Sequence, residues 1–207
     1  MNRGHKGEAI FHEDRDKALF LEILAEKRVT HHIRIFAYCI MNNHYHLVLE
    51  NSSGNMADFL RHINGHYALL YRRNYGGKGY VFQDRYQSIL IEDDSYLIQA
   101  IVYVLANPLK AGLMKDGNDY LWYSFRKYFK GAKDSLLDNH YIEELFGSAL
   151  ELKKLICSST NSELAINKTK LGKLLGGQDF FPKALKKYNR RHHEDAVHKK
   201  RRDDFYF

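Results

Sequence analysis

Two histidines near residue 45 are the first side chains whose types and spacing could support chemistry. His44 and His46 flank Tyr45 in an alternating apolar stretch, so in a β-strand both imidazoles project from one face. Two imidazoles about 7 Å apart on one face can share a divalent cation. The same spacing also suits two hydrogen-bonded histidines, and a metal site needs a further ligand.

A tyrosine followed four residues later by a side chain with a ligand atom is the second pattern. Four tyrosines have such a neighbour: Tyr38 with Asn42, Tyr80 with Asp84, Tyr103 with Asn107 and Tyr188 with His192. Tyr38 lies in a predicted strand, where four residues span about 13 Å, and Tyr80 precedes a predicted turn. Of the remaining two, only Tyr103 lies in a clearly amphipathic helical segment. The alternative is a boundary aromatic at 103 and an ordinary helix-end residue at 107.

The elements that must position these residues follow from the apolar periodicity. It predicts helices over about 12–30, 55–73 and 92–107, and a hairpin with strands at 33–40 and 44–50. Short strands are predicted at 81–82 and 88–91, and beyond residue 120 the pattern is helical. The strands are joined too closely for parallel crossovers, so this order predicts an α+β fold with an antiparallel sheet.

Composition limits the class of protein. The 207 residues are 44% hydrophobic and 14% aromatic with two prolines, which is typical of one folded domain or one domain with an extension. No apolar run has the roughly 18 residues of a membrane span, and no apolar region follows Met1–Glu8, so we expect an unexported protein that does not enter a membrane. Cys39 and Cys157 are far apart and belong to no paired motif, so the sequence indicates neither a disulfide framework nor a thiolate zinc site.

Positive charge is concentrated at the C-terminus. Of the net charge of +7, residues 183–207 carry +5, from nine basic and four acidic residues. Such a segment binds polyanions, usually nucleic acid, by releasing counterions, although it could also be a solvated tail that keeps the protein soluble. The basic residues are Lys183, Lys186, Lys187, Arg190, Arg191, Lys199, Lys200, Arg201 and Arg202.

Four motifs in a fixed order carry a family resemblance. They are Asn2-Arg-Gly4, Met41-Asn-Asn-His44-Tyr-His46 within the stretch 37–49, Val81-Phe-Gln-Asp-Arg-Tyr86, and Tyr103-Val-Leu-Ala-Asn107-Pro-Leu-Lys-Ala-Gly-Leu113. From Asn2 to about Phe129 the chain resembles the single-tyrosine HUH transposases, most closely their REP-associated branch.

The resemblance implies a ferredoxin-like (RRM-like) antiparallel sheet with helices on one face. The transposase domain would cover residues 1–130, and residues 131–207 would form a basic helical C-terminal extension. Two departures from the family pattern stand out. The sequence begins at Met1, only one residue before the first motif, so the family's first strand is either shortened or incomplete at its start, and Asn42 occupies a position where proline is common.

The resemblance also implies a reaction. His44, His46 and Asn107 would bind Mg²⁺ or Mn²⁺, and Tyr103 would attack a DNA phosphate to form a 5′-phosphotyrosine bond. Single-stranded or hairpin DNA would be the partner, with Gln83, Arg85 and the basic C-terminal residues as contacts. The protein would be cytoplasmic and nucleoid-associated, as a monomer or a homodimer.

Two other functions are compatible with the same sequence. One is a domesticated protein that binds hairpin DNA without transposition. The other is an RRM-like RNA-binding module in which Phe36 and Tyr38 stack on bases. Metal-dependent nicking would separate the transposase from both, because a binding module has no use for a tyrosine and an asparagine facing two histidines.

Overall fold

The chain folds into two compact units. The computed structural model describes residues 1–115, 120–129, 136–159, 163–169, 172–180, 182–184 and 186. The first unit comprises Met1–Gln87 and Ile98–Leu164, and the second comprises Ser88–Leu97 and Ala165–Phe207. His44, His46, Tyr103 and Asn107 all lie in the first unit.

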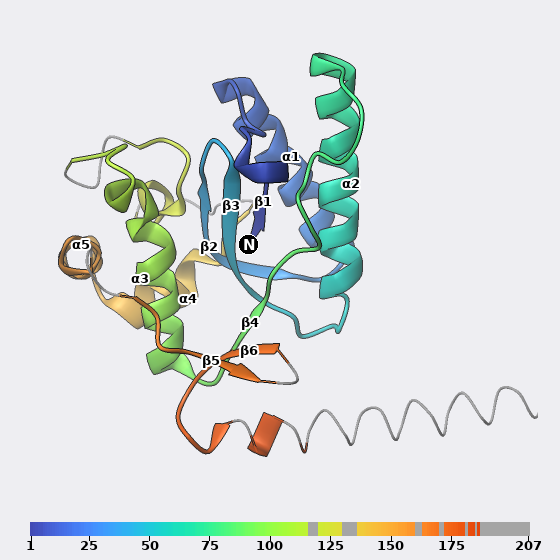
Figure 1. Ribbon diagram of the computed structural model, residues 1–207. Helices are drawn as coiled ribbons and strands as arrows, with labels where there is room; N and C mark the ends of the chain where they lie inside the picture. Colours follow the sequence, from blue (N-terminus) through green and yellow to red (C-terminus); the bar gives the residue numbers. More distant parts are fainter. Residues whose placement is uncertain are drawn as a thin grey trace, which may run out of the picture. The chain divides into compact units, whose positions relative to one another are not determined.

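The first unit contains most of the helices (Figure 1). In chain order its elements are β1 (Asn2–Arg3), the 3-10 helix η1 (His5–Gly7), α1 (Asp14–Thr30), β2 (Arg34–Ile40), β3 (His44–Glu50), α2 (Met56–Tyr75), α3 (Asp94–Lys110, with its first residues in the second unit), η2 (Ser124–Lys127), α4 (Asn139–Phe146) and α5 (Ala149–Ser158). No helix in the described ranges combines the length and the apolar character that crossing a lipid bilayer requires.

A three-stranded antiparallel sheet with the order β1-β3-β2 forms the centre of the first unit. The predicted hairpin is confirmed, with Ile40 opposite Tyr45 beside the turn. The turn is bound to the N-terminal segment, because the Asn42 carbonyl accepts from the backbone N–H groups of Ile10 and Phe11. The α+β class is therefore confirmed, while the predicted strand at 81–82 is reduced to a single bridge between Gly4 and Phe82.

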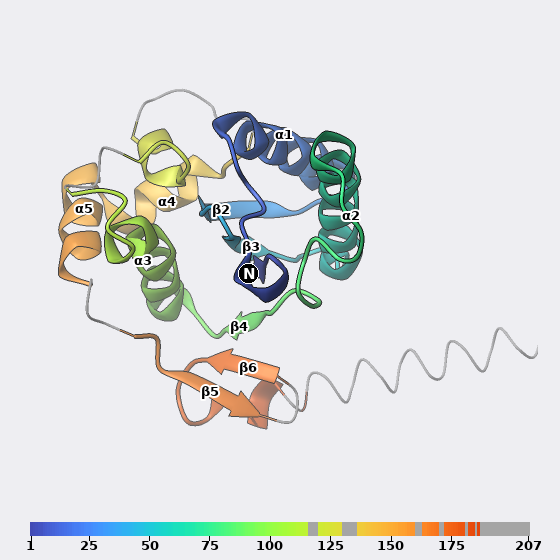
Figure 2. The same ribbon diagram turned by 45° about the horizontal axis from the view of Figure 1, so that its top comes forward.

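Helices cover both faces of this sheet (Figures 1 and 2). On one face, the Tyr45 ring lies 4.7 Å from that of Phe20 in α1, and its hydroxyl donates to Asn64 in α2 over 2.7 Å. On the other face, His46 contacts Tyr103 of α3. The expectation of helices on one face is therefore wrong. The reason is visible in β2, where every residue from 35 to 40 is buried, so both of its faces need cover.

Aromatic side chains fill the space between the sheet and the α1–α2 pair. The ring of Phe20 lies 5.3 Å from that of Phe11 and 5.4 Å from that of Tyr67, and all three side chains are buried. The Tyr67 hydroxyl donates to the Ile10 carbonyl, so its polar atom is satisfied inside the core. Burying such a ring stabilises the fold by about 1.5–3 kcal/mol, which holds β3 firmly from the face opposite the histidines.

Helix α3 passes through Pro108, although the sequence predicted an end there. Proline has no N–H, so the carbonyl of Val104 loses its usual backbone donor. The side-chain Nδ2 of Asn107 donates to this carbonyl over 3.3 Å and to that of Tyr103 over 2.8 Å. The helix therefore continues to Lys110, and Gly112 follows with a φ of +69°, which suits glycine.

The second unit contains a separate small sheet. Its strands β4 (Ile89–Ile91), β5 (Ile166–Thr169) and β6 (Gly172–Leu175) have the order β4-β6-β5, with β4 parallel and β5 antiparallel to β6. Helices α4 and α5 agree with the predicted helical extension, but β5 and β6 contradict it. β5 pairs only with β6, its neighbour along the chain, whereas β6 also pairs with β4, which is far away in the sequence, and local periodicity does not reveal that second pairing.

Candidate active site

The two histidines predicted as a metal pair lie together on the face of β3 that contacts α3. Their ring centroids are 5.0 Å apart and the ring planes meet at 83°. His46 is buried, with 9% of its surface exposed, and His44 is half-buried. The two-residue period of the strand therefore brings both imidazoles to one place.

Burial keeps both imidazoles neutral. It lowers the pKa of His44 from 6.5 to about 4, with smaller contributions from the charges of Arg3 and the N-terminal amine. Burial also holds the pKa of His46 well below its ordinary value, and a charge on His44 lowers it further. A neutral imidazole carries the lone pair that binds a metal ion. Near pH 7 the pair thus presents two metal-binding nitrogens.

Helix α3 brings Tyr103 to the histidines. The centroids of the Tyr103 and His46 rings are 6.1 Å apart, with the planes at 82°. Ile101 and Leu105 on the same helix are fully buried and fix its position, whereas Tyr103 is only half-buried. The Nζ of Lys110 lies over the Tyr103 ring, 4.8 Å from its centroid. The Tyr103 ring thus contacts both a neutral imidazole and an ammonium group.

Asn107 lies one turn beyond Tyr103, on the same side of α3. Its Nδ2 donates to the carbonyls of Tyr103 and Val104, so the amide nitrogen faces the helix backbone. Because this nitrogen is hydrogen-bonded to the backbone of its own helix, Oδ1 is the atom of the amide that can accept a hydrogen bond from an outside group or bind a metal ion. The geometry therefore supports Asn107 as an oxygen donor.

His44, His46 and Asn107 offer two imidazole nitrogens and an amide oxygen, which are atom types that divalent cations accept in proteins. Within the described residues no three His, Cys, Asp or Glu side chains gather at one point, so the amide oxygen is needed for a three-ligand set. All three donors are neutral, which leaves the charge of an ion free to attract an anionic group such as a phosphate. Such a set does not select strongly among divalent ions.

Comparison with known families gives separate evidence for the class of protein. The family model described as "Transposase IS200 like" matches residues 5–107. The match supports a transposase family. The matched range includes His44, His46 and Tyr103 and ends at Asn107, while the REP-associated branch stays a prediction. No curated protein and no solved structure matches the chain.

A transposase family implies DNA as the partner, and two predicted DNA contacts lie near the histidine strand. Gln83 and Arg85 are both exposed. The backbone N–H of Gln83 donates to the Arg3 carbonyl over 2.9 Å, and Arg3 pairs with His44 across β1 and β3. The segment that carries Gln83 and Arg85 thus runs beside β1, the strand that pairs with β3 at His44.

The basic C-terminal residues are only partly described. Lys183 and Lys186 are exposed, and the Lys183 Nζ lies 3.9 Å from a carboxylate oxygen of Glu92. The other predicted contacts of this segment lie outside the described residues; they are Lys187, Arg190, Arg191, Lys199, Lys200, Arg201 and Arg202. Tyr188 also lies outside the described residues.

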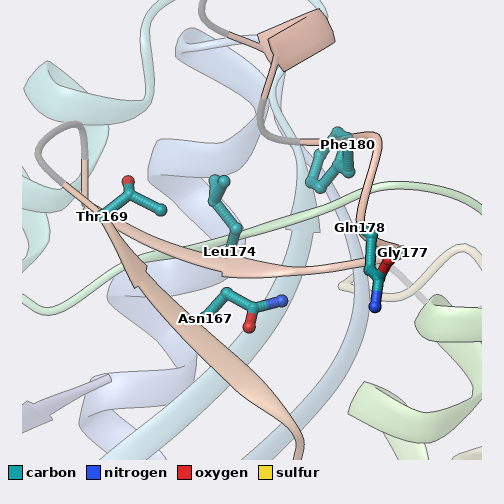
Figure 3. Close-up of a pocket in the computed structure, with 6 residues that line it drawn as sticks. All are labelled: Asn167, Thr169, Leu174, Gly177, Gln178 and Phe180. Carbon is teal, nitrogen blue, oxygen red and sulfur yellow. The ribbon is translucent and has the colours of Figure 1, made fainter.

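A cavity of about 300 Å³ lies in the second unit (Figure 3). Asn167 and Thr169 of β5, Leu174 of β6, and the residues Gly177, Gln178 and Phe180 that follow β6 line it. None of the predicted catalytic residues lines this cavity. The candidate active site in the first unit is therefore a separate feature of the chain.

The structure contradicts the predicted base-stacking role of Phe36 and Tyr38. Only 5% of Phe36 and 1% of Tyr38 are exposed. The Phe36 ring lies 5.1 Å from that of Tyr141 in α4, and the backbone N–H of Tyr38 donates to Ser124. Because these neighbours cover the sheet, neither ring can stack on a base, and the observation that suggested an RNA-binding module no longer holds.

Two residues of the site were missed by the sequence analysis. Asn43 was assigned to a turn, but its Oδ1 lies 2.6 Å from Nδ1 of His44. Lys110, beside the Tyr103 ring, was quoted only as part of a motif. Lys110 follows Tyr103 by seven residues, or about two helical turns, and this spacing could have placed the two on one face.

Proposed function

We propose that this protein is a metal-dependent transposase of the single-tyrosine HUH type that cuts and rejoins single DNA strands. The observation that carries the proposal is the contact between Tyr103 and His46, 6.1 Å between ring centroids, on the face where His44 also lies. The match to a transposase family model supports the general activity. The resemblance of the four motifs favours the REP-associated branch.

His44, His46 and the Oδ1 of Asn107 would hold Mg²⁺ or Mn²⁺. The low pKa of His44, about 4, keeps protons from competing for its ring at neutral pH. When bound, the ion would polarise the scissile phosphate and neutralise part of its charge. The Asn107 amide would orient its oxygen through the two hydrogen bonds that its nitrogen makes to the helix backbone.

Tyr103 would be the nucleophile. Its phenol oxygen forms a bond to phosphorus, and the bond from phosphorus to the 3′ oxygen breaks. The electron pair stays on the 3′ oxygen, which takes up a proton, while the phenol releases one to solvent. The ammonium of Lys110, 4.8 Å from the ring centroid, stabilises negative charge beside the phenol.

The linkage at Tyr103 would also be reversible. A phenol is a much better leaving group than an alkyl alcohol, so a second DNA 3′-hydroxyl can displace it without an external energy source. Cleavage and rejoining are then the two directions of one step. This property distinguishes a strand-transferring enzyme from a nuclease that releases its products.

The substrate would be single-stranded DNA beside a hairpin. Gln83 and Arg85 would contact it near the active site, and the basic residues between Lys183 and Arg202 would add affinity through phosphates. Residues 1–130 would form the catalytic domain with a ferredoxin-like sheet. The protein would act at the nucleoid as a monomer or a homodimer.

A covalent adduct tests the proposal. Wild-type protein is incubated with labelled hairpin-bearing single-stranded DNA and Mn²⁺, and the mixture is separated under denaturing conditions. We expect an adduct with wild type and none with Tyr103→Phe, which removes one oxygen and preserves the fold. Tyr188→Phe and Tyr96→Phe, the latter on the same helix, are matched controls that should form the adduct normally.

Two outcomes would change the assignment. An adduct that survives Tyr103→Phe would exclude this residue as the nucleophile. Tight hairpin binding without any adduct from the wild-type protein would favour the domesticated DNA-binding protein instead.

A further inference from the structure

The amide of Asn43 links His44 to the N-terminal segment. Its Nδ2 lies 3.1 Å from the Gly7 carbonyl oxygen, and its Oδ1 lies 2.6 Å from Nδ1 of His44. A carbonyl oxygen only accepts hydrogen bonds, so the atom of Asn43 that faces Gly7 must be the NH₂ group. The oxygen of the amide must then face the imidazole.

This orientation determines which ring nitrogen of His44 carries the proton. An amide oxygen also only accepts, so Nδ1 of His44 has to donate. A neutral imidazole has one N–H, and placing it on Nδ1 leaves the lone pair on Nε2. We infer that Asn43 is a positioning residue that sets the tautomer of His44 and so makes Nε2 its metal-binding atom. The inference rests on the proposed function only where it takes His44 as a metal ligand.

The backbone around Asn43 makes this orientation rigid. The Asn43 carbonyl accepts from the backbone N–H of Gly4 over 2.8 Å, which ties the residue to the end of β1. The Gly7 carbonyl belongs to the short helix η1, and Gly7 has a φ of +78°, a conformation that favours glycine. A side chain at Gly7 would be strained by this backbone conformation and would have to displace the Arg3 guanidinium, which lies 2.7 Å from the position of a Cβ. The main chain of Asn43 and the carbonyl that its Nδ2 meets are therefore both held by backbone hydrogen bonds or backbone conformation, which leaves Oδ1 facing the His44 side chain.

A residue that hydrogen-bonds to a metal-binding histidine, as Asn43 does to His44, affects metal affinity without contacting the metal. Partners that orient a metal-binding histidine typically change affinity 10- to 100-fold when they are removed. Asn43→Leu preserves the size of the side chain and removes both hydrogen bonds. Asn43→Asp removes the donor to Gly7 and retains an acceptor for Nδ1. Comparing the two variants thus separates the loss of the hydrogen bond between Asn43 and His44 from the loss of the hydrogen bond between Asn43 and Gly7.

The tautomer can be measured directly in the metal-free, ¹⁵N-labelled full chain. Two-bond ¹H–¹⁵N correlation spectra distinguish a protonated Nδ1 from a protonated Nε2, and His44→Gln identifies the signals of His44. We expect a protonated Nδ1 in wild type and Asn43→Asp, and a shift toward protonated Nε2 in Asn43→Leu. Asn42→Leu, at the neighbouring exposed position of the same turn, should leave the tautomer unchanged.

Mn²⁺ titration of the same proteins gives the second readout. We expect Asn43→Leu to weaken binding by about 10- to 100-fold and Asn43→Asp to retain most of it. A protonated Nε2 in wild type, or an unchanged tautomer in Asn43→Leu, would overturn the inference. The expected tautomers with no Mn²⁺ binding in wild type would uphold the role of Asn43 and reject the proposed metal site.

Discussion

His46 depends on burial for its chemical state. It lies under α3 with 9% of its surface exposed, its ring between those of His44 and Tyr103. This position removes water from the imidazole and disfavours the charged form. The same position puts its ring beside that of Tyr103, the residue that the proposed reaction uses as the nucleophile.

Removing the His46 imidazole should weaken metal binding. His46→Ala deletes one of three proposed donors, so we expect at least tenfold lower affinity for Mn²⁺ in a titration of the metal-free protein, or about 1.4 kcal/mol. His62→Ala is the matched control, because His62 is an exposed histidine on α2 that pairs with His31. Equal affinities of His46→Ala and wild type would exclude the site.

The buried histidines should also make stability depend on pH. In the unfolded chain, His44 and His46 each take up a proton near pH 6.5. In the folded protein, His44 takes up its proton only near pH 4, and His46 does so well below pH 6.5. The unfolded state therefore gains protons first on acidification, and the free energy of unfolding should fall as the pH drops from 6.5 toward 4.

Urea unfolding followed by the fluorescence of Trp122 measures this dependence, since Trp122 is the single tryptophan and lies in the first unit. His44→Gln combined with His46→Gln should give a flatter profile between pH 6.5 and 4 than wild type. Parallel profiles would show that other groups control the acid sensitivity.

At the scale of elements, α3 combines a structural and a chemical task in one residue. Its continuation through Pro108 relies on Nδ2 of Asn107, which donates to the carbonyls of Tyr103 and Val104. Its proposed chemical task relies on Oδ1 of the same side chain. The two tasks use different atoms, so substitutions can separate them.

Asn107→Asp and Asn107→Leu form a matched pair for this test. Both remove the two hydrogen bonds, and we expect both to lower the free energy of unfolding by about 1–2 kcal/mol. Only the aspartate retains an oxygen donor, so Mn²⁺ affinity should persist in Asn107→Asp and fall at least tenfold in Asn107→Leu. If the two variants bind Mn²⁺ equally weakly, Asn107 supports the helix and does not bind the metal.

At the scale of the whole molecule, charge is distributed unevenly. Residues 183–207 hold nine of the 32 basic residues and carry +5 of the +7 net charge. The predicted active site lies in the first unit and this segment belongs to the second. DNA affinity and DNA chemistry can therefore be tested by separate changes to the chain.

Truncation after Pro182 should reduce affinity for single-stranded DNA without removing the adduct chemistry. For each DNA phosphate that the shortened protein no longer neutralises, the slope of log affinity against log salt should flatten by about 0.7 to 0.9. Lys153→Gln combined with Lys154→Gln removes charge from α5 instead and should leave the slope nearly unchanged. An unaltered slope in the truncated protein would make the segment a solubility feature.

Local periodicity in the sequence was sufficient for several parts of this structure. The two-residue period of a strand puts His44 and His46 on one face, and the helical period puts Tyr103 and Asn107 on one side of α3. The periodicity also predicted a helix from about residue 12 to 30, which corresponds to α1, and the structure shows Glu13 and Asp16 forming a capping box at its start. These features depend on residues within one turn or a few strand positions of each other.

Tertiary structure alone decided which of these faces meet. Sequence periodicity did not show that α3 would cover the histidine face, that β4 would pair with β6, or that Phe36 and Tyr38 would be buried. It also assigned Asn43 to a turn, although the Gly7 carbonyl orients its amide toward His44. Each of these outcomes depends on packing or hydrogen bonding between segments far apart in the chain, and the energy of such interactions exists only once the segments have come together.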